Sequence, residues 1–339
     1  MSDESVVTAP PPAAGVRVPW ADMPAEVRSA VEELLGDRVV EAVTQPGGFS
    51  PGVAARLRLA GGGRAFVKAT GPHLNPESPG LHRAEARITA ALPPSAPVPR
   101  LLGTLDPVGV EGWVVLAFED VAGRHPDQPW REDELRRVLA AATDLATALT
   151  PAPVEAPLVA DAIDEQFRGW RRLAREYRDG EDTLSWLDPW ARDHVDRLAA
   201  LEDTWAEAAA GDTLLHNDMR ADNMLVTADG VVFVDWPWAA VGAPWFDLAG
   251  MIPSVLLNGG PALLPVIDEH VAAFDPDPDA VTAVLAALTG YLLYQSHQPP
   301  PPGLPTVRAF QRANGEAALP ALRHRLDPGS RPPRGDRPK

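Results

Sequence analysis

The segment LLHNDMRADNMLVTADGVVFVDWPWAAVGAPWFDLA, from Leu214 to Ala249, is the most informative part of this 339-residue chain. Asp218 stands two residues after His216, Asn223 stands five residues after Asp218, and Asp235 ends the following extended run. An Asp-Gly pair within that run is typical of a tight hairpin turn between two short strands. Such a hairpin returns Asp235 to the neighbourhood of Asp218, so we expect the three oxygen-bearing side chains to meet.

These three side chains are the kinds that phosphoryl transfer requires. The transferred group carries charge on its equatorial oxygens, so catalysis depends on positioning and electrostatic stabilisation. One carboxylate has to take the proton of the acceptor hydroxyl, while a second carboxylate and a neutral oxygen hold Mg²⁺ against the phosphates. Asp218, Asn223 and Asp235 supply one residue of each kind. The alternative is that they only cap loops, as short Asp and Asn side chains often do.

The segment resembles the catalytic loop and metal-binding segment of the protein-kinase-like superfamily, and within it the aminoglycoside phosphotransferase family. The resemblance implies that Asp218 is the catalytic base and that Asn223 and Asp235 are the magnesium ligands. It also implies that His216 ties the loop to the segment around Asp235. The later Pro-Trp-Phe-Asp-Leu-Ala run matches as well, and its Asp247 is implied to brace the catalytic loop.

Arg220 is a further candidate, because eukaryotic protein kinases place a lysine at this distance from the base, against the γ-phosphate. We expect Arg220 to act with Asp218 in catalysis. The alternative is that it only pairs with Asp222 or Asp247. The Asp-Trp-Pro run at 235–237 departs from the protein-kinase Asp-Phe-Gly and favours a small-molecule kinase.

The N-terminal third is expected to bind the nucleotide. A glycine-rich turn contains Gly48 and Ser50, whose backbone N–H and hydroxyl groups could meet phosphate oxygens. Lys68 follows in an apolar strand, and the chain has no other lysine except Lys339. A kinase needs such a lysine on the phosphates and a carboxylate to hold it, which we expect to be Glu85 in the next helix. The alternative for that glutamate is an arginine of its own helix.

The segment after the last strand of that region is expected to link two lobes. By resemblance, the adenine edge of ATP bonds the backbone there, at Phe118, Glu119 and Val121, with GTP as the other donor considered. The glycine-rich turn also fits the Gly-x-Ser-x-Gly pattern of hydrolases. Pro51 argues against a hydrolase, since it has no N–H to donate to an oxyanion.

Composition limits the class of partner. A formal net charge of −17 disfavours nucleic acid, because that binding depends on Lys and Arg neutralising phosphates. The charge would suit a cationic small molecule, and the alternative is that it serves solubility alone. The absence of cysteine excludes disulfides and thiolate chemistry. We see no signal peptide and no apolar run of about 20 residues, so a cytoplasmic monomer or homodimer away from membranes is expected.

Residue patterns predict an α+β fold, and the resemblance implies that it is protein-kinase-like. Residues 1–18 and 327–339 are expected to be disordered tails. Residues 19–118 should form an N-terminal lobe, an antiparallel sheet with one main helix, and residues 119–326 a larger, mostly helical lobe that holds the catalytic and acceptor sites. Strands are expected at 39–44, 53–59, 65–69, 100–104 and 113–118. Helices are expected near 24–35, 81–92, 132–149, 161–178 and 190–209.

Acceptor contacts are expected from the helical lobe. The acidic candidates for binding an ammonium group are Asp161, Asp164, Glu165, Asp222, Asp268 and Glu269. A solvated helix face explains most of them equally well. The family resemblance does not name the acceptor, since relatives act on aminoglycosides, macrolides, choline-like amines, amino acids and sugars. The sequence therefore predicts ATP- and Mg²⁺-dependent transfer to a hydroxyl of a small molecule, or alternatively a kinase-like protein that binds nucleotide or ligand without transfer.

Overall fold

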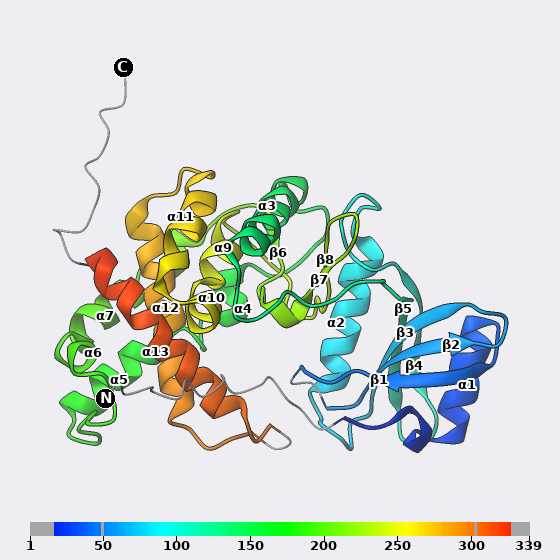
Figure 1. Ribbon diagram of the computed structural model, residues 1–339. Coiled ribbons are helices and arrows are strands. Elements are labelled where there is room, and N and C mark those ends of the chain that lie inside the picture. Colours follow the sequence, from blue (N-terminus) through cyan, green and yellow to red (C-terminus); the bar gives the residue numbers. More distant parts are fainter. Residues whose placement is uncertain (1–16, 49–50, 302–303, 327–339) are drawn as a thin grey trace, which may run out of the picture.

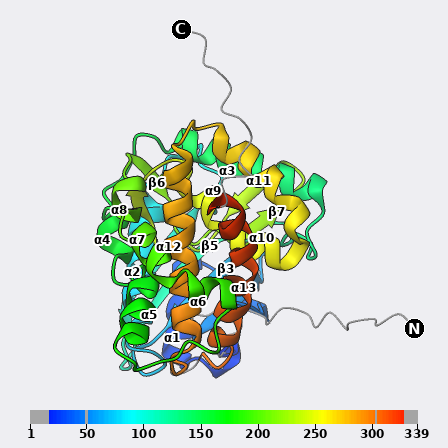
Figure 2. The same cartoon turned by 90° about the vertical axis from the view of Figure 1, so that its left-hand side faces the viewer.

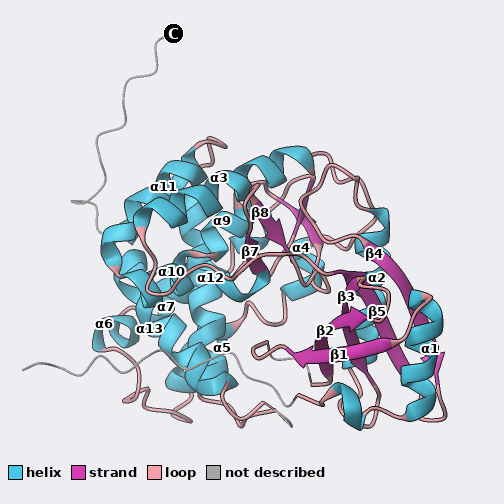
Figure 3. Ribbon diagram, turned by 45° about the vertical axis from the view of Figure 1, so that its right-hand side comes forward, coloured by secondary structure: helices cyan, strands magenta, loops and turns pink. Residues whose placement is uncertain are grey.

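The computed structural model describes residues 17–48, 51–301 and 304–326, which form two lobes (Figure 1). The first lobe is built on a five-stranded antiparallel sheet, whereas the second is mostly helical and contains two small two-stranded sheets (Figure 3). The α+β architecture predicted from the sequence is therefore confirmed. Within the described residues, no helix combines the length and the apolar character needed to cross a membrane.

The sheet of the first lobe has the strand order β1-β2-β3-β5-β4. Its strands are β1 (Val39–Thr44), β2 (Val53–Leu59), β3 (Arg64–Thr70), β4 (Leu101–Val108) and β5 (Trp113–Glu119). Side chains alternate between the faces of β2, as its sequence predicts. Ala55 and Leu57 are buried in the core of the lobe, whereas Arg56 projects from the opposite face. The register pairs Arg56 with Phe66 and Ala54 with Lys68, so these four side chains share the face that carries the cavity described below.

Two helices cover the sheet, and they lie on different sides of it. The first, α1 (Ala25–Leu35), follows the short 3-10 helix η1 (Trp20–Asp22) and lies farthest from the second lobe (Figure 1). Gly36 ends α1 in the left-handed region, with φ 72°, as is typical of a helix C-terminus. The other, α2 (Ser78–Ala91), lies between the sheet and the second lobe (Figure 1). This position brings α2 side chains to the boundary between the lobes.

The second lobe packs its helices around a large apolar core. Its helices are α3 (Glu132–Ala148), α4 (Val159–Ile163), α5 (Gly169–Arg178), α6 (Pro189–Asp193), α7 (Val195–Glu202), α8 (Trp205–Ala208), α9 (Phe246–Gly250), α10 (Ile252–Gly259), α11 (Leu264–Ala272), α12 (Pro278–Ser296) and α13 (Val307–Leu326), with the 3-10 helices η2 (Ala221–Asn223) and η3 (Pro261–Leu263). The long helices α12 and α13 run side by side (Figure 2). Because α12 is buried on most sides, it forms the centre of the lobe.

The catalytic segment forms two short β ladders in the second lobe. The strands β7 (Met224–Val226) and β8 (Val231–Phe233) make the predicted hairpin. The strands β6 (Thr213–Leu215) and β9 (Ala240–Gly242) pair with each other around it. The second pairing was not anticipated, because it joins two short runs that are distant in sequence.

The helix expected over 161–178 is divided into α4 and α5. The second part starts again at Gly169, where a Cβ atom would lie 2.0 Å from the carbonyl oxygen of Gly290 in α12. The backbone N–H of Trp170 donates to Glu202 Oε1 at 2.9 Å, so a side chain from α7 satisfies the new helix start. The helix expected over 190–209 is likewise divided, into α6, α7 and α8. The first break coincides with contacts to α12 and α7, which periodicity does not reveal.

The end of the predicted N-terminal tail differs from expectation. Residues 1–16 and 327–339 lie outside the described residues, but Arg17 and Val18 are described. Arg17 forms a parallel bridge with Gly52, and the Val18 N–H donates to the Gly52 carbonyl at 3.0 Å. The last two residues of the predicted tail therefore belong to the first lobe.

Candidate active site

The catalytic loop curls because its own side chains bond across it. Asn223 Nδ2 donates to the Asp218 carbonyl at 2.8 Å and to Asp218 Oδ2 at 3.0 Å. Arg220 Nη1 donates to the other carboxylate oxygen of Asp218 at 2.9 Å. The Val234 N–H donates to the Asn223 carbonyl at 2.9 Å, which joins the end of the hairpin to the loop. Asp235 follows directly, so the hairpin brings it back to the loop.

His216 and Asp247 hold the loop from below. His216 Nε2 lies 2.9 Å from the Val234 carbonyl oxygen. Because a carbonyl can only accept, Nε2 carries the proton of the ring. The other ring nitrogen, Nδ1, then accepts the Asp218 N–H at 3.3 Å. Burial lowers the pKa of His216, so the ring is neutral near pH 7. Asp247 accepts the N–H groups of His216 at 2.7 Å and Asn217 at 2.9 Å. These contacts join the loop to the end of the hairpin and to α9.

Two residues of the segment adopt left-handed backbone conformations. Asn217 has φ 61° and Asp235 has φ 69°. Asn and Asp tolerate this region better than most residues other than glycine, because their short side chains bond locally. The carboxylate of Asp247 satisfies the backbone at Asn217. At Asp235 the strained conformation points the side chain at Lys68.

Lys68 forms a partly buried charged triad with Glu85 and Asp235. Its Nζ donates to the two carboxylate oxygens of Glu85 at 2.8 and 3.0 Å and to Asp235 Oδ1 at 2.7 Å. Burial by itself would lower the pKa of Lys68, but the charges of Asp235 and Glu85 outweigh it and raise the pKa. Burial would raise the pKa of Asp235, whereas Lys68 lowers it to about 2, so Asp235 is ionised near neutral pH. The triad links β3, α2 and the end of the catalytic hairpin.

A cavity between the two lobes collects most of the residues predicted from the sequence. Those that line it are Gly48, Lys68, Glu85, Phe118, Glu119, Val121, Asp222, Asn223 and Asp235. Asp218 is joined to it through its bonds with Asn223. Ser50 lies outside the described residues. Arg17, Arg56 and His125 also line the cavity, although the sequence did not single them out.

The environment of Asp218 adjusts its basicity. Burial raises the pKa of Asp218 to about 6, with Arg220 opposing and the charges of Asp222 and Asp235 adding to the rise. A carboxylate with that pKa is ionised at pH 7 yet is a better proton acceptor than an exposed aspartate. Arg220 donates Nε and Nη2 to the two oxygens of Asp222 at 3.0 and 2.8 Å. Arg220 therefore bridges Asp218 and Asp222, and the pair with Asp222 is one of the two pairs considered for it from the sequence.

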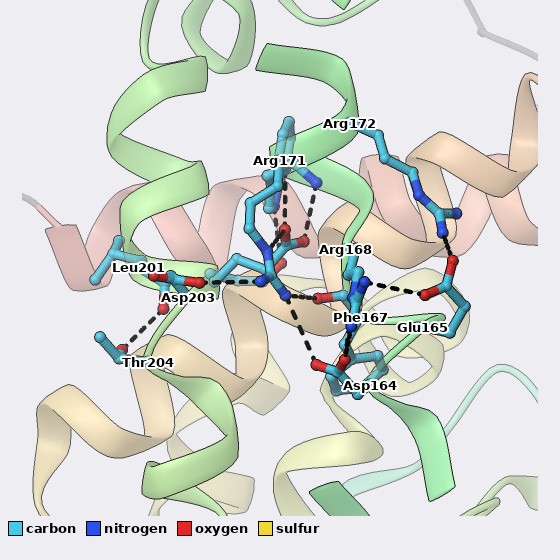
Figure 4. A network of polar contacts seen from close by, with 12 residues as sticks. Asp164, Glu165, Phe167, Arg168, Arg171, Arg172, Leu201, Asp203 and Thr204 are labelled. Carbon is cyan, nitrogen blue, oxygen red and sulfur yellow. Dashed lines mark hydrogen bonds and ion pairs between the residues drawn. The ribbon is translucent and has the colours of Figure 1, made fainter. Parts of the chain in front are cut away.

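The acidic candidates for acceptor binding are mostly paired with arginines. Figure 4 shows Asp164 with Arg168 and Glu165 with Arg168 and Arg172, in a network on α4, α5 and the segment between them. The remaining pairs are Asp268 with Arg325 and Glu269 with Arg136, while Asp161 is exposed. These carboxylates are neutralised by neighbours, and among those predicted for the acceptor only Asp222 lines the cavity.

Helices α12 and α13 contribute side chains near the base that the sequence did not reveal. The Arg220 guanidinium lies 5.5 Å from the centre of the Phe310 ring, within cation–π range. Gln311 Nε2 donates to Tyr291 Oη at 3.3 Å. Burial raises the pKa of Tyr291, and the charge of Asp218 adds to the rise. Trp238 is 45% exposed, and its carbonyl accepts from Asn217 Nδ2 at 3.1 Å.

The two predicted magnesium ligands fit that ion. Asp235 offers an ionised carboxylate, and Asn223 uses its amide nitrogen on Asp218, which leaves the amide oxygen for a cation. No group of three or more His, Cys, Asp or Glu side chains within the described ranges could hold a metal ion. Mg²⁺ does not need one, because it is usually bound by one or two protein oxygens together with substrate phosphates and water.

The two lobes, the cavity between them and the catalytic hairpin define the protein-kinase-like class of phosphotransferase folds. The chain belongs to the phosphotransferase enzyme family, whose model matches residues 47–284. A stretch of 64 residues, 19% of the chain, is 36% identical to the protein LicA homolog of Mycoplasma capricolum subsp. capricolum. That stretch spans 27% of the length of this relative.

Solved structures with the same fold are found among aminoglycoside and choline kinases. The chain is similar to aminoglycoside phosphotransferase APH(4)-Ia, with a TM-score of 0.59 and 16% identity over 89% of this chain and 99% of that one. A thermostable mutant of the same enzyme, in a ternary complex with ADP and hygromycin B, gives a TM-score of 0.57 and 15% identity over 88% and 98%. Choline kinase LicA from Streptococcus pneumoniae gives 0.54 and 14% over 87% and 98%. At these identities the likeness establishes the fold.

Proposed function

We propose that this protein is a small-molecule kinase that transfers the γ-phosphoryl group of ATP to a hydroxyl, with Mg²⁺ as cofactor. The observation that carries the proposal is the convergence of Asp218, Asn223 and Asp235 with the Lys68–Glu85 pair around one cavity between the lobes. Each group that phosphoryl transfer needs is present there in a suitable ionisation state.

Asp218 is the proposed base. Its carboxylate accepts the proton of the acceptor hydroxyl as the bond from that oxygen to the γ-phosphorus forms and the bond from phosphorus to the β–γ bridging oxygen breaks. ADP then leaves, and the proton on Asp218 returns to solvent. Arg220, which holds Asp218 and Asp222, supplies positive charge beside the reacting groups.

The nucleotide is proposed to lie along the face of β2 and β3. Lys68, held by Glu85, binds its phosphates, and the backbone at Phe118, Glu119 and Val121 forms hydrogen bonds with the adenine ring. Asn223 and Asp235 hold Mg²⁺, which neutralises phosphate charge when it is bound. The same site would accept GTP unless the backbone that contacts the nucleobase distinguishes guanine from adenine. Use of such a donor fits the cytoplasm, where we propose the protein acts.

The acceptor is proposed to bind between the catalytic loop and α12 and α13, beside Tyr291, Phe310 and Gln311. The acidic helix residues pair with arginines, so they do not favour a cationic acceptor over a neutral one. Aromatic and amide groups near the base suit a polar molecule that carries hydroxyls, such as a sugar or an amino sugar.

The test is ADP release with ATP and Mg²⁺ across a panel of hydroxyl compounds: hygromycin B and other aminoglycosides, macrolides, choline, amino acids and sugars. The Asp218→Ala variant is the blank. We expect at least one compound to stimulate release by the unmodified protein only. The alternative, a kinase-like binding protein, predicts nucleotide binding without release stimulated by any compound and with no difference between the two proteins.

A further inference from the structure

Arg17 reaches the predicted nucleotide site from outside the part of the chain that the family model matches. Its backbone is fixed at the end of the glycine-rich turn, through the bridge to Gly52 and the bond from the Val18 N–H to the Gly52 carbonyl. Gly52 has φ 137°, and a Cβ atom there would lie 2.4 Å from the Ala69 carbonyl oxygen. The N-terminal segment is thus packed against the turn at a position where only glycine fits.

The side chain of Arg17 turns into the cavity. Its Nη2 donates to the Gly47 carbonyl and lies 2.7 Å from where a Cβ atom of Gly48 would be. Gly48 has φ 73°, so a side chain at this position would be strained and would also collide with the guanidinium. The group therefore lies over the turn in which the sequence predicts a phosphate cover.

The guanidinium also lies within the electrostatic reach of the charged triad. Burial lowers the pKa of Arg17, and the charge of Asp235 partly offsets this. Burial lowers the pKa of His82, and the positive charges of Lys68 and Arg17 add to this effect. Arg17 and Lys68 also line the same cavity, so one polyanion bound there could contact both.

Three cationic side chains of the described residues line the cavity. Among the described residues that line it, Arg17, Arg56 and Lys68 carry positive charge. Arg56 lies 3.4 Å from Asp120 at the link between the lobes, and Lys68 is shared by Glu85 and Asp235. A triphosphate needs more positive charge than one shared lysine provides. Arg17 adds a further cation at the glycine-rich turn, where its Nη2 donates to the Gly47 carbonyl.

We propose that Arg17 is a phosphate-binding residue of the nucleotide site, which donates parallel N–H groups to the phosphate oxygens of ATP and ADP. The N-terminal segment thereby completes a site whose other residues lie in the matched part of the chain. This inference rests on the proposed kinase function, because it takes the ligand to be a nucleoside phosphate.

The test compares ligands with and without phosphates. Affinities for ATP, ADP and adenosine are measured by titration calorimetry on the full chain and on the variants Arg17→Ala and Arg17→Lys. Arg38→Ala is the matched control, because Arg38 is an exposed arginine of the same lobe that does not line the cavity. We expect Arg17→Ala to weaken ATP and ADP about tenfold, as the loss of one charge-assisted contact would. We expect the affinity of Arg17→Ala for adenosine to be unchanged, and the affinities of Arg38→Ala for all three ligands to be unchanged. The affinities of Arg17→Lys for ATP and ADP should lie between those of the unmodified protein and those of Arg17→Ala.

Other outcomes would overturn the inference. Unchanged ATP affinity in Arg17→Ala would show that the residue does not bind phosphate, and tighter binding would show that it blocks the site. An equal loss for adenosine would mean that Arg17 only supports the lobe. If Arg17→Ala does not fold, Arg17→Gln serves with the same expectation. An unmodified protein that binds neither ATP nor ADP would contradict the proposed function itself, and the inference with it.

Discussion

The catalytic hairpin and the acceptor side of the helical lobe use charge in opposite ways. The acceptor side is here the part of that lobe that carries the acidic residues predicted to bind the acceptor, together with α12 and α13. At the hairpin, Asp218, Asn223 and Asp235 bond to one another or to Lys68 and converge on a cavity. On the acceptor side, carboxylates such as Glu165 pair with arginines along their own helices and loops. Convergence on a cavity indicates chemistry, whereas pairing along a surface indicates folding and solubility. The comparison shows that an acidic residue has to be judged by where its carboxylate points.

The largest effect is expected at Asp218. Asp218→Asn keeps the size of the side chain but cannot accept the proton, so kcat should fall about 10²- to 10⁴-fold. ADP affinity, measured by calorimetry, should stay within about twofold of the unmodified protein. Glu165→Gln is the control on the acceptor side, and its kcat should be unchanged. Equal losses in the two variants would remove the distinction between the regions.

A smaller loss is expected when the partner of Lys68 is removed. Glu85→Gln deletes the charge that holds Lys68 on the phosphates, while Asp235 still contacts the amine. A hydrogen bond to a charged group contributes about 1.5–3 kcal/mol, so kcat/KM for ATP should fall roughly 10- to 100-fold. Steady-state kinetics with varied ATP would measure it, and Glu33→Gln, at an exposed position of α1 that does not line the cavity, is the control. An unchanged kcat/KM would mean that the triad is only structural.

The pH dependence offers a finer test of the hairpin. The pKa of Asp218 is about 6, so kcat should fall as the pH drops through 6 and the base becomes protonated. Arg220 lowers that pKa, so Arg220→Gln should move the acidic limb to higher pH. Activity measured from pH 5 to 9 would show the shift. A limb that stays in place, or moves to lower pH, would argue against Asp218 as the titrating base.

The smallest catalytic effect is expected at Glu202, which belongs to the network behind the acceptor side. This buried carboxylate accepts the N–H groups of Trp170 and Arg171, each at 2.9 Å. Glu202→Gln should lower the free energy of unfolding by about 1–3 kcal/mol, because an amide cannot satisfy both donors. Its kcat and KM should change less than twofold. Urea denaturation and kinetics would separate the two effects, and exposed Glu269→Gln should alter neither.

The residues inside the hairpin segment could be predicted because their geometry is local. The spacing from His216 to Asn223 and the Asp-Gly turn before Asp235 are enough to bring the loop and the hairpin together. Lys68 was identifiable because the chain has no other lysine except Lys339 and uses arginine at its other basic positions. Its contact with Glu85 crosses from a strand to a helix, and it was expected only through the family resemblance.

The residues of the acceptor side could not be predicted in the same way. Glu165 and Glu269 carry the same charge in the sequence as Asp218. The pair of Glu165 with Arg168 has a spacing that a helix makes readable, whereas Glu269 pairs with Arg136, which is distant in the sequence. Tyr291 and Phe310 lie on long apolar helices, where most neighbours are core residues, so periodicity does not distinguish them. Their place beside the base depends on how α12 and α13 pack.

Local pattern alone was sufficient to establish the class of fold, the elements of the first lobe and the catalytic hairpin. These features depend on alternation, turn chemistry and short spacings, which are properties of neighbouring residues. Packing of distant elements was needed to divide the helices at Gly169, to neutralise the acidic helix residues and to bring Arg17 over the glycine-rich turn. The physical reason is that burial and ion pairing depend on which surfaces meet, and those surfaces are far apart along the chain.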